Sequence, residues 1–160
     1  MAEQKTNVMR VLDQKKIPYV AHEYTHSNAP VDGETVASLI GKDAECVYKT
    51  LVTRGGSKKI YVFVVPVKKE LDLKRAAKAA GEKSIEMIHV SEITALTGYV
   101  RGGCSPVGMK KLYPTFFDSA VNDLDTVIVS AGKIGAQVEV TPRDLIGLVR
   151  AKTADIAKEP

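Results

Sequence analysis

The sequence predicts an α+β fold, in which a curled, mostly antiparallel mixed sheet of six or seven strands, or a barrel, is flanked by helices. Three observations favour this class. Short apolar runs with strand-like spacing are joined by glycine-rich turns, helix start signals occur between these runs, and 160 residues suffice to bury a sizeable core. No repeat or long linker divides the chain, so we expect residues 1–160 to form one domain.

The N-terminal segment favours a helix, a strand and a second helix. Residues 6–15 place aliphatic side chains on one helical stripe. Pro18 disfavours helix before it, so residues 17–24 are expected to be extended. Asp32 is a suitable N-cap for the next helix, and Gly41 is suited to end it.

Residues 46–53 and 58–67 are predicted to form the two strands of a β-hairpin. The intervening "RGGS" is rich in turn-forming residues. The second strand is apolar on both faces. We therefore expect it in the middle of a sheet, with cover on each side.

The C-terminal half again alternates between helix and strand signals. Asp72 should cap a helix that stops at Gly81. Residues 124–132 and 136–140 favour two strands on either side of a glycine turn. Thr141 then begins a last helix, because the proline that follows it suits the first helical position.

Charge, hydropathy and cysteine content exclude several classes of protein. The net charge of +4 is a mild bias toward polyanions. The longest apolar run, residues 60–67, is too short to cross a bilayer, and the N-terminus lacks the apolar core of a signal peptide. We expect a cytoplasmic protein with neither a membrane nor a DNA partner. Cys46 and Cys104 form no zinc-ligand set, so we expect no metal, no cofactor and no disulfide.

Lys49 is the first candidate for a functional residue. Strand alternation places it on one face between Val47 and Leu51. An ammonium there must either reach past its aliphatic neighbours to water or point into a cavity with an anion or strong acceptors. The alternative is a face that simply meets solvent at a sheet edge.

The segment "RGGCSPVG" is the second candidate. Gly102 and Gly103 can adopt positive φ and allow another molecule to approach the backbone. Successive amides in such a turn form a concave set of donors, suited to a phosphate or a carbonyl oxygen. Pro106 stiffens the far side of the loop. A plain connecting turn is the alternative, and the pattern is not that of a P-loop.

The segment "SAGKIGAQ" is a third candidate. Gly132 and Lys133 lie in another donor-rich turn, to which Ser130 could add a hydroxyl. A tight hairpin explains the same residues. No nucleophile is evident, because the sequence places no histidine beside Cys104 and contains no GxSxG motif.

Taken together, these segments resemble the YbaK/EbsC family of aminoacyl-tRNA deacylases and the editing domain of bacterial prolyl-tRNA synthetases. The matching pieces occur in family order over nearly the whole chain. They include "HEYTH", "CVYKTLV", "TGYVRGGCSPVGMKKLYPTFFD" and "VSAGKIGAQVEV". The resemblance implies a pocket for the aminoacylated 3′ end of a mischarged tRNA. The implied substrate is Cys-tRNA(Pro), and also Cys-tRNA(Cys).

The resemblance also implies functional residues. The family's invariant lysine falls on Lys49, its pocket tyrosine on Tyr24, and its glycine pair on Gly102 and Gly103. Close relatives carry an acidic residue where this chain has Gln137, which weakens any role for a carboxylate there. We expect Lys49, Gly102 and Gly103 to be catalytic, and the following residues to bind substrate: Tyr24, Thr50, Cys104, Ser105, Pro106, Ser130, Gly132, Lys133 and Gln137.

The mechanism implied by the resemblance is substrate-assisted. The thiol of the bound cysteine attacks its own ester, the glycine loop stabilises the oxyanion, and Lys49 binds the terminal phosphate or ribose. Prolyl-tRNA synthetase is a candidate partner that would deliver the tRNA. The alternatives are a deacylase for another amino acid such as alanine, a non-catalytic module that binds nucleotides or tRNA ends, and thiol-redox chemistry at Cys104.

Overall fold

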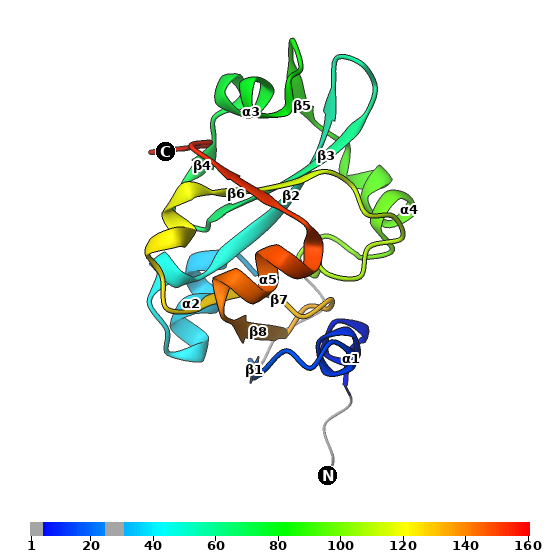
Figure 1. The fold of residues 1–160 in the computed structure, drawn as a ribbon. Coiled ribbons are helices and arrows are strands. Elements are labelled where there is room, and N and C mark those ends of the chain that lie inside the picture. The colour runs from blue at the N-terminus through cyan, green and yellow to red at the C-terminus, as the bar shows by residue number, and fades with distance from the viewer. Residues whose placement is uncertain (1–4, 25–30) are drawn as a thin grey trace.

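The computed structural model describes residues 5–24 and 31–160. Over this part of the chain the strands form three sheets: β5-β2-β3-β6-β9, β1-β8-β7 and the pair β10-β4 (Figure 1). Parallel pairing occurs at β3–β6 and β6–β9, and the other strand pairs are antiparallel. The predicted α+β class with a mostly antiparallel mixed arrangement is therefore confirmed, as separate sheets and not as a closed barrel.

The strands are β1 (Tyr19–Glu23), β2 (Tyr48–Gly55), β3 (Ile60–Pro66), β4 (Glu70–Leu71), β5 (Ile85–Met87), β6 (Thr115–Asp118), β7 (Val127–Ser130), β8 (Ala136–Val140), β9 (Lys152–Ala154) and β10 (Ala157–Lys158). The α-helices are α1 (Asn7–Gln14), α2 (Gly33–Ile40), α3 (Leu73–Ala80), α4 (Ile93–Thr97) and α5 (Pro142–Val149). Short 3-10 helices span Ala44–Cys46 (η1), Val90–Glu92 (η2) and Ser119–Asp123 (η3).

The hairpin of β2 and β3 forms the centre of the larger sheet, as predicted. β3 lies between β2 and β6, and four successive side chains, Val62 to Val65, are fully buried. Because a central strand has neighbours at both edges and cover on both faces, it has no need for polar alternation.

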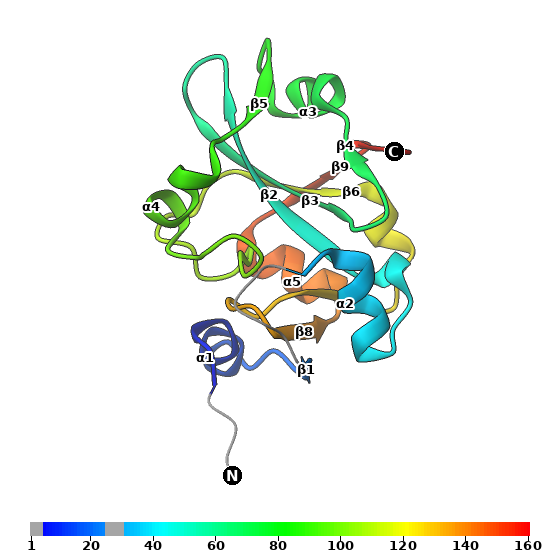
Figure 2. The same ribbon diagram turned by 180° about the vertical axis from the view of Figure 1, so that it is seen from behind.

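The smaller sheet has one core face and one face that helps to form the functional site. On β8, Ala136, Val138 and Val140 point into the main hydrophobic core, where residues of α5 also pack. Gln137 and Glu139 alternate with them and point to the opposite side. Figure 2 shows α2 in front of this sheet and α5 behind it, so the two helices lie on opposite faces.

Helix ends follow the capping residues that the sequence contains. The side chains of Asp32 and Asp72 accept hydrogen bonds from backbone amides in the first turns of α2 and α3. Gly41 and Gly81 end these helices in the left-handed conformation. Thr141 stands at the predicted N-cap of α5, but its side chain makes no capping hydrogen bond. In residues 5–24 and 31–160, no helix is long and apolar enough to span a membrane.

Candidate functional site

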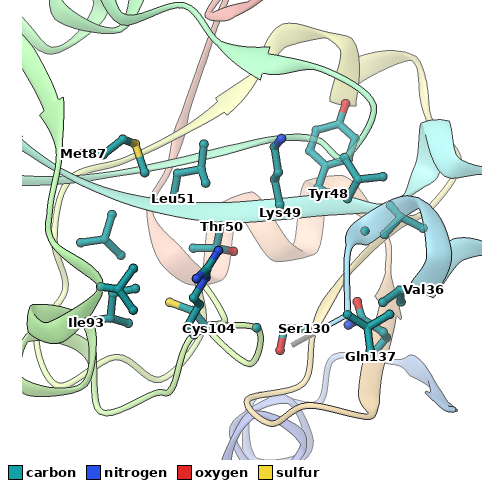
Figure 3. A pocket seen from close by; sticks show the side chains of 18 of the residues that line it. Val36, Tyr48, Lys49, Thr50, Leu51, Met87, Ile93, Cys104, Ser130 and Gln137 are labelled. Carbon is teal, nitrogen blue, oxygen red and sulfur yellow. The ribbon is translucent and has the colours of Figure 1, made fainter. Parts of the chain in front are cut away.

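A pocket of about 410 Å³ lies where β2 passes between the ends of β7 and β5. Both neighbouring strands stop short of the middle of β2. In the described residues, β7 is bridged to the chain at Val47, immediately before β2, through Ile128, and β5 pairs with β2 from Thr53 onward. The segment of β2 between these points lines the pocket (Figure 3). The hollow therefore results from a gap in strand pairing.

The pocket brings together half of the residues that the sequence analysis selected. Those lining it are Lys49, Thr50, Gly102, Cys104, Ser130 and Gln137. Those outside its lining are Tyr24, Gly103, Ser105, Pro106, Gly132 and Lys133. Tyr24 extends the pairing of β1 with β8 through a hydrogen bond from its N–H to the Gly135 carbonyl, and its side chain is buried.

The side chains of Lys49 and Thr50 leave β2 on opposite faces of the strand (Figure 3). Figure 3 shows Lys49 leaving the strand on the same side as Leu51, whereas Thr50 points toward Cys104. The Lys49 side chain is half-buried, and burial lowers its pKa below the usual 10.5, against the opposing charges of Glu70 and Glu34. Among the described residues, no side chain forms an ion pair with it. A partly dehydrated ammonium of this kind is suited to an anionic ligand.

The two glycines of the predicted loop have different structural roles. Gly102 has φ of +85°, which favours glycine. At Gly103 an added Cβ would lie 2.9 Å from the Lys133 Cα, closer than real contacts allow. Gly103 therefore lets this loop pack directly on the turn that follows β7. Its amide donates to the Val100 carbonyl at 3.0 Å, so it is already used within the loop.

Ser105 and Pro106 shape the loop from inside the protein. The Ser105 Oγ accepts a hydrogen bond from the Val107 N–H at 3.2 Å, and the residue is fully buried. Pro106 lines a separate hollow of about 110 Å³ on the side of α5. The structure thus supports a positioning role for both residues, at a distance from the main pocket.

Ser130 and Gln137 face each other across β7 and β8 and share the side that faces the pocket. The Ser130 Oγ accepts from the Gly132 N–H at 3.1 Å, which fixes the glycine turn. Gly132 has φ of +98°, and a Cβ there would lie 3.0 Å from the Tyr99 ring. Gln137 is only 6% exposed, and no hydrogen bond joins its side-chain amide to another described residue.

Glu139 lies two positions beyond Gln137 on β8, and its carboxylate makes several polar contacts with neighbouring segments. It lies 2.8 Å from His22 Nε2 and 3.5 Å from Lys42 Nζ, and it accepts from the Thr126 hydroxyl. Burial opposes ionisation of Glu139, but these partners outweigh burial and leave its pKa lowered. The carboxylate joins β1, β8 and the chain after α2, so it is occupied by structural contacts.

Cys104 is a poor nucleophile in this setting. Burial raises the pKa of its thiol to about 11, so almost none is ionised at neutral pH. The described residues also contain no group of three or more His, Cys, Asp or Glu side chains that could hold a metal ion. The Cys104 thiol is therefore not activated as a nucleophile in this pocket.

We expect Cys104→Ser to keep deacylation within about tenfold of wild type, because Cys104 lines the pocket as a small side chain whose thiolate is scarcely populated. Steady-state rates on an aminoacyl-tRNA check this, with iodoacetamide labelling of the native protein as a measure of thiol reactivity. Complete loss of activity in a folded variant would restore the thiol-based alternative.

Two features of the pocket were not predicted from the sequence. Arg101 adds a second basic side chain, and Met87, Val90 and Ile93 form an apolar wall. Arg54, on β2, holds this wall through paired hydrogen bonds to the Glu92 carboxylate at 2.8 and 3.3 Å. The position of Arg101 immediately before Gly102 was a usable signal, but the wall comes from a distant segment.

Comparisons of this chain with a family model and with a curated relative indicate the same family. Residues 30–148 match the model of the aminoacyl-tRNA editing domain. A curated relative from Enterococcus faecalis, EbsC, is 44% identical over 154 residues, which is 96% of this chain and 94% of the relative. That protein is assigned as a Cys-tRNA(Pro)/Cys-tRNA(Cys) deacylase.

Solved structures share the fold over nearly the full chain. A crystal structure assigned as a trans-editing enzyme for prolyl-tRNA synthetase is 27% identical, covers 94% of both chains and superposes with a TM-score of 0.81. The crystal structure of a hypothetical protein superposes with a TM-score of 0.84 over 94% of this chain and 99% of the other. At 23% identity, the second match supports the fold alone.

Proposed function

This chain belongs to the family of aminoacyl-tRNA editing domains, and we propose on this basis that residues 1–160 act as one trans-editing domain that deacylates Cys-tRNA(Pro) and also Cys-tRNA(Cys). The observation that carries the proposal is the pocket itself. It joins Lys49, the Gly102 loop and the Ser130–Gln137 face of the smaller sheet around a hollow of about 410 Å³. That volume suits a small acyl group with part of its nucleoside.

The chemistry can come from the substrate. The sulfur of the esterified cysteine attacks its own carbonyl carbon, so a carbon–sulfur bond forms and the bond from that carbon to the ribose oxygen breaks. The thiol proton ends on the ribose hydroxyl, and the products are a cyclic thiolactone and free tRNA. The protein then needs to orient the ester and to stabilise the oxyanion.

The division of the pocket by β2 suggests how the substrate is placed. Lys49 and Thr50 leave the strand on opposite sides (Figure 3). The Lys49 ammonium is suited to the terminal phosphate or ribose. The acyl group then lies on the Thr50 side, near Cys104, Ser130 and Gln137. Arg101 supplies a further cation for the RNA backbone at the rim.

The first test is deacylation of Cys-tRNA(Pro) by the purified protein, with product analysis. We expect accelerated release of free tRNA over buffer, together with thiolactone, because the attacking thiol belongs to the substrate. Alanyl and prolyl esters on the same tRNA should react far more slowly, since they lack a thiol. A faster alanyl ester would assign the protein to another amino acid. Salt-dependent tRNA binding without cleavage would identify a binding module instead.

The partner and the location are proposed on the same basis. We propose that prolyl-tRNA synthetase delivers the tRNA, in the cytoplasm where aminoacyl-tRNAs are used, because a solved structure of the same fold is assigned as a trans-editing enzyme for that synthetase. Co-purification of the two proteins in the presence of tRNA(Pro) checks this. The proposal would be contradicted if the two proteins did not associate at micromolar concentrations and if adding the synthetase left the deacylation rate unchanged.

A further inference from the structure

The main chain of β2 has an open edge inside the pocket. On the side away from β3, pairing with β7 is limited to the bridge at Val47, and pairing with β5 begins at Thr53. Between these points, residues 49–51 have no strand partner on that edge among the described residues. Unpaired backbone groups at a strand edge are a template for another extended segment.

The direction of each main-chain group follows from two hydrogen bonds. The Val47 carbonyl accepts from the Val67 N–H at 2.9 Å, so the main-chain carbonyl of Val47 points toward the β3 side of the hairpin. Lys49 and Leu51 follow by alternation. The Val52 carbonyl accepts from the Ile88 N–H at 3.3 Å, on the opposite edge. Thr50 shares the orientation of Val52, so both its N–H and its carbonyl point into the open edge.

The Thr50 side chain adds a second, independent indication of a ligand. Its hydroxyl is buried and has no hydrogen-bond partner. A buried hydroxyl without a partner is unfavourable by about 1–3 kcal/mol. Thr50 therefore presents, at one point of the pocket, a main-chain donor and acceptor that no other described residue pairs with on this edge, together with an unsatisfied hydroxyl.

An aminoacyl ester has the complementary pattern. Its α-ammonium is a donor and its ester carbonyl an acceptor, and the two are separated by one carbon, as in a residue of a β-strand. We infer that the aminoacyl group pairs with Thr50 as a one-residue antiparallel strand: the α-ammonium donates to the Thr50 carbonyl, and the ester carbonyl accepts from the Thr50 N–H. This inference rests on the proposed function and specifies how the same pocket recognises its substrate.

The pairing has two geometric consequences. Opposed residues of an antiparallel pair direct their side chains to the same side, so the substrate side chain lies with Thr50, toward Cys104 and Ser130. An antiparallel partner also runs opposite to β2, so the ester oxygen and ribose point toward Lys49. The Thr50 N–H supplies an oxyanion donor, in a site where the Gly103 amide is used within its own loop.

The first experiment measures binding to the wild-type protein without any chemical step. The probes are adenosine carrying a 3′-cysteinylamino group, and the same compound with 3-mercaptopropionyl in place of cysteinyl, which lacks only the α-ammonium. Calorimetry should give affinity about 10- to 100-fold weaker for the second probe, as expected for loss of a charged hydrogen bond. Equal affinities, or no binding of either probe, would overturn the pairing.

The second experiment removes the donor from the protein. Thr50→Pro deletes an N–H that faces the pocket and that β3 does not use, which a strand edge tolerates. We expect kcat/KM about 10- to 100-fold below that of Thr50→Val, which loses only the hydroxyl. Leu51→Pro is the matched control for orientation, because its N–H faces β3, and it should unfold the protein. Equal rates for Thr50→Pro and Thr50→Val, both folded, would refute the inference.

These outcomes are separate from failure of the proposed function. If the wild type does not cleave Cys-tRNA, the proposed function is wrong whatever the probes do. If the wild type cleaves Cys-tRNA but the two probes bind equally well, the function stands and the pairing with Thr50 is wrong. The probe comparison uses wild-type protein, so it tests the pairing with Thr50 even if Thr50→Pro fails to fold.

Discussion

Lys49→Met is expected to lower deacylation of Cys-tRNA by about 10²–10³ while raising the thermal stability of the protein. The lysine is half-buried, and burial lowers the pKa of its ammonium. Methionine has a similar length and carries no charge that must be dehydrated. The stabilising effect should be a few °C in Tm, at about 2–4 °C per kcal/mol for a chain of this size. The activity should fall because the proposed charged contact between Lys49 and the substrate is lost.

The lowered pKa also fixes how this stability difference depends on pH. Between the folded-state pKa of Lys49 and 10.5, the unfolded chain binds more protons than the native protein at this residue. The stability contribution of Lys49 therefore rises with pH across that window. The advantage of Lys49→Met should be largest at neutral pH and should shrink toward pH 10.5.

Lys83→Met is the matched control, because Lys83 is exposed and lies outside the pocket lining. It should change neither rate nor Tm appreciably. Thermal melts across pH and single-turnover deacylation measure the two effects. Full activity in folded Lys49→Met would remove this residue from the mechanism, and a lower Tm would show that its ammonium is stabilising.

Gly103→Ala is expected to destabilise the protein by about 1–3 kcal/mol and to lower deacylation by about 10². A Cβ at this position would lie 2.9–3.0 Å from backbone atoms of Lys133 and Ile134. Backbone cannot rotate away as a side chain does, so the two loops must separate. That movement should displace Gly102 and Ser130, which both line the pocket.

Gly147→Ala is the matched control for the same chemical change. Gly147 lies inside α5, and an added Cβ would meet nothing within 4 Å. Alanine favours a helix interior by up to about 1 kcal/mol over glycine, so this variant should be neutral or more stable. Denaturant unfolding and deacylation rates compare the two. Wild-type behaviour of Gly103→Ala would show that close packing of the loops is unimportant.

Most secondary structure could be predicted because its signals are local. Asp32 and Asp72 cap their helices with their own side chains, and Gly41 and Gly81 end them. The apolar stretch of β3 lies in the middle of its sheet as expected. Thr141 is an exception in one respect. Its position and the proline after it correctly indicate where α5 begins, but its side chain forms no capping hydrogen bond.

The candidate site was predicted in part, and for an identifiable reason. Residue types in their segments indicated Lys49, Gly102 and Ser130, and the family resemblance added Thr50, Cys104 and Gln137. All six line one pocket. Motif reasoning could not separate them from Gly103, Ser105 and Gly132, which hold the loops in place. It also missed the apolar wall at Met87, which consists of ordinary aliphatic residues from another part of the chain.

What short stretches of residues specify here is the identity of each element: alternation along β2, the caps of the helices and the turns that contain Gly102 and Gly132. The pocket depends on contacts between segments far apart in the chain. β7 leaves β2 after Val47, and β5 joins it at Thr53. Nothing within β2 encodes where its neighbours begin and end, because any strand edge carries the same main-chain donors and acceptors. Packing of the two sheets selects which of these groups remain unpaired, and at Thr50 it leaves them facing the site.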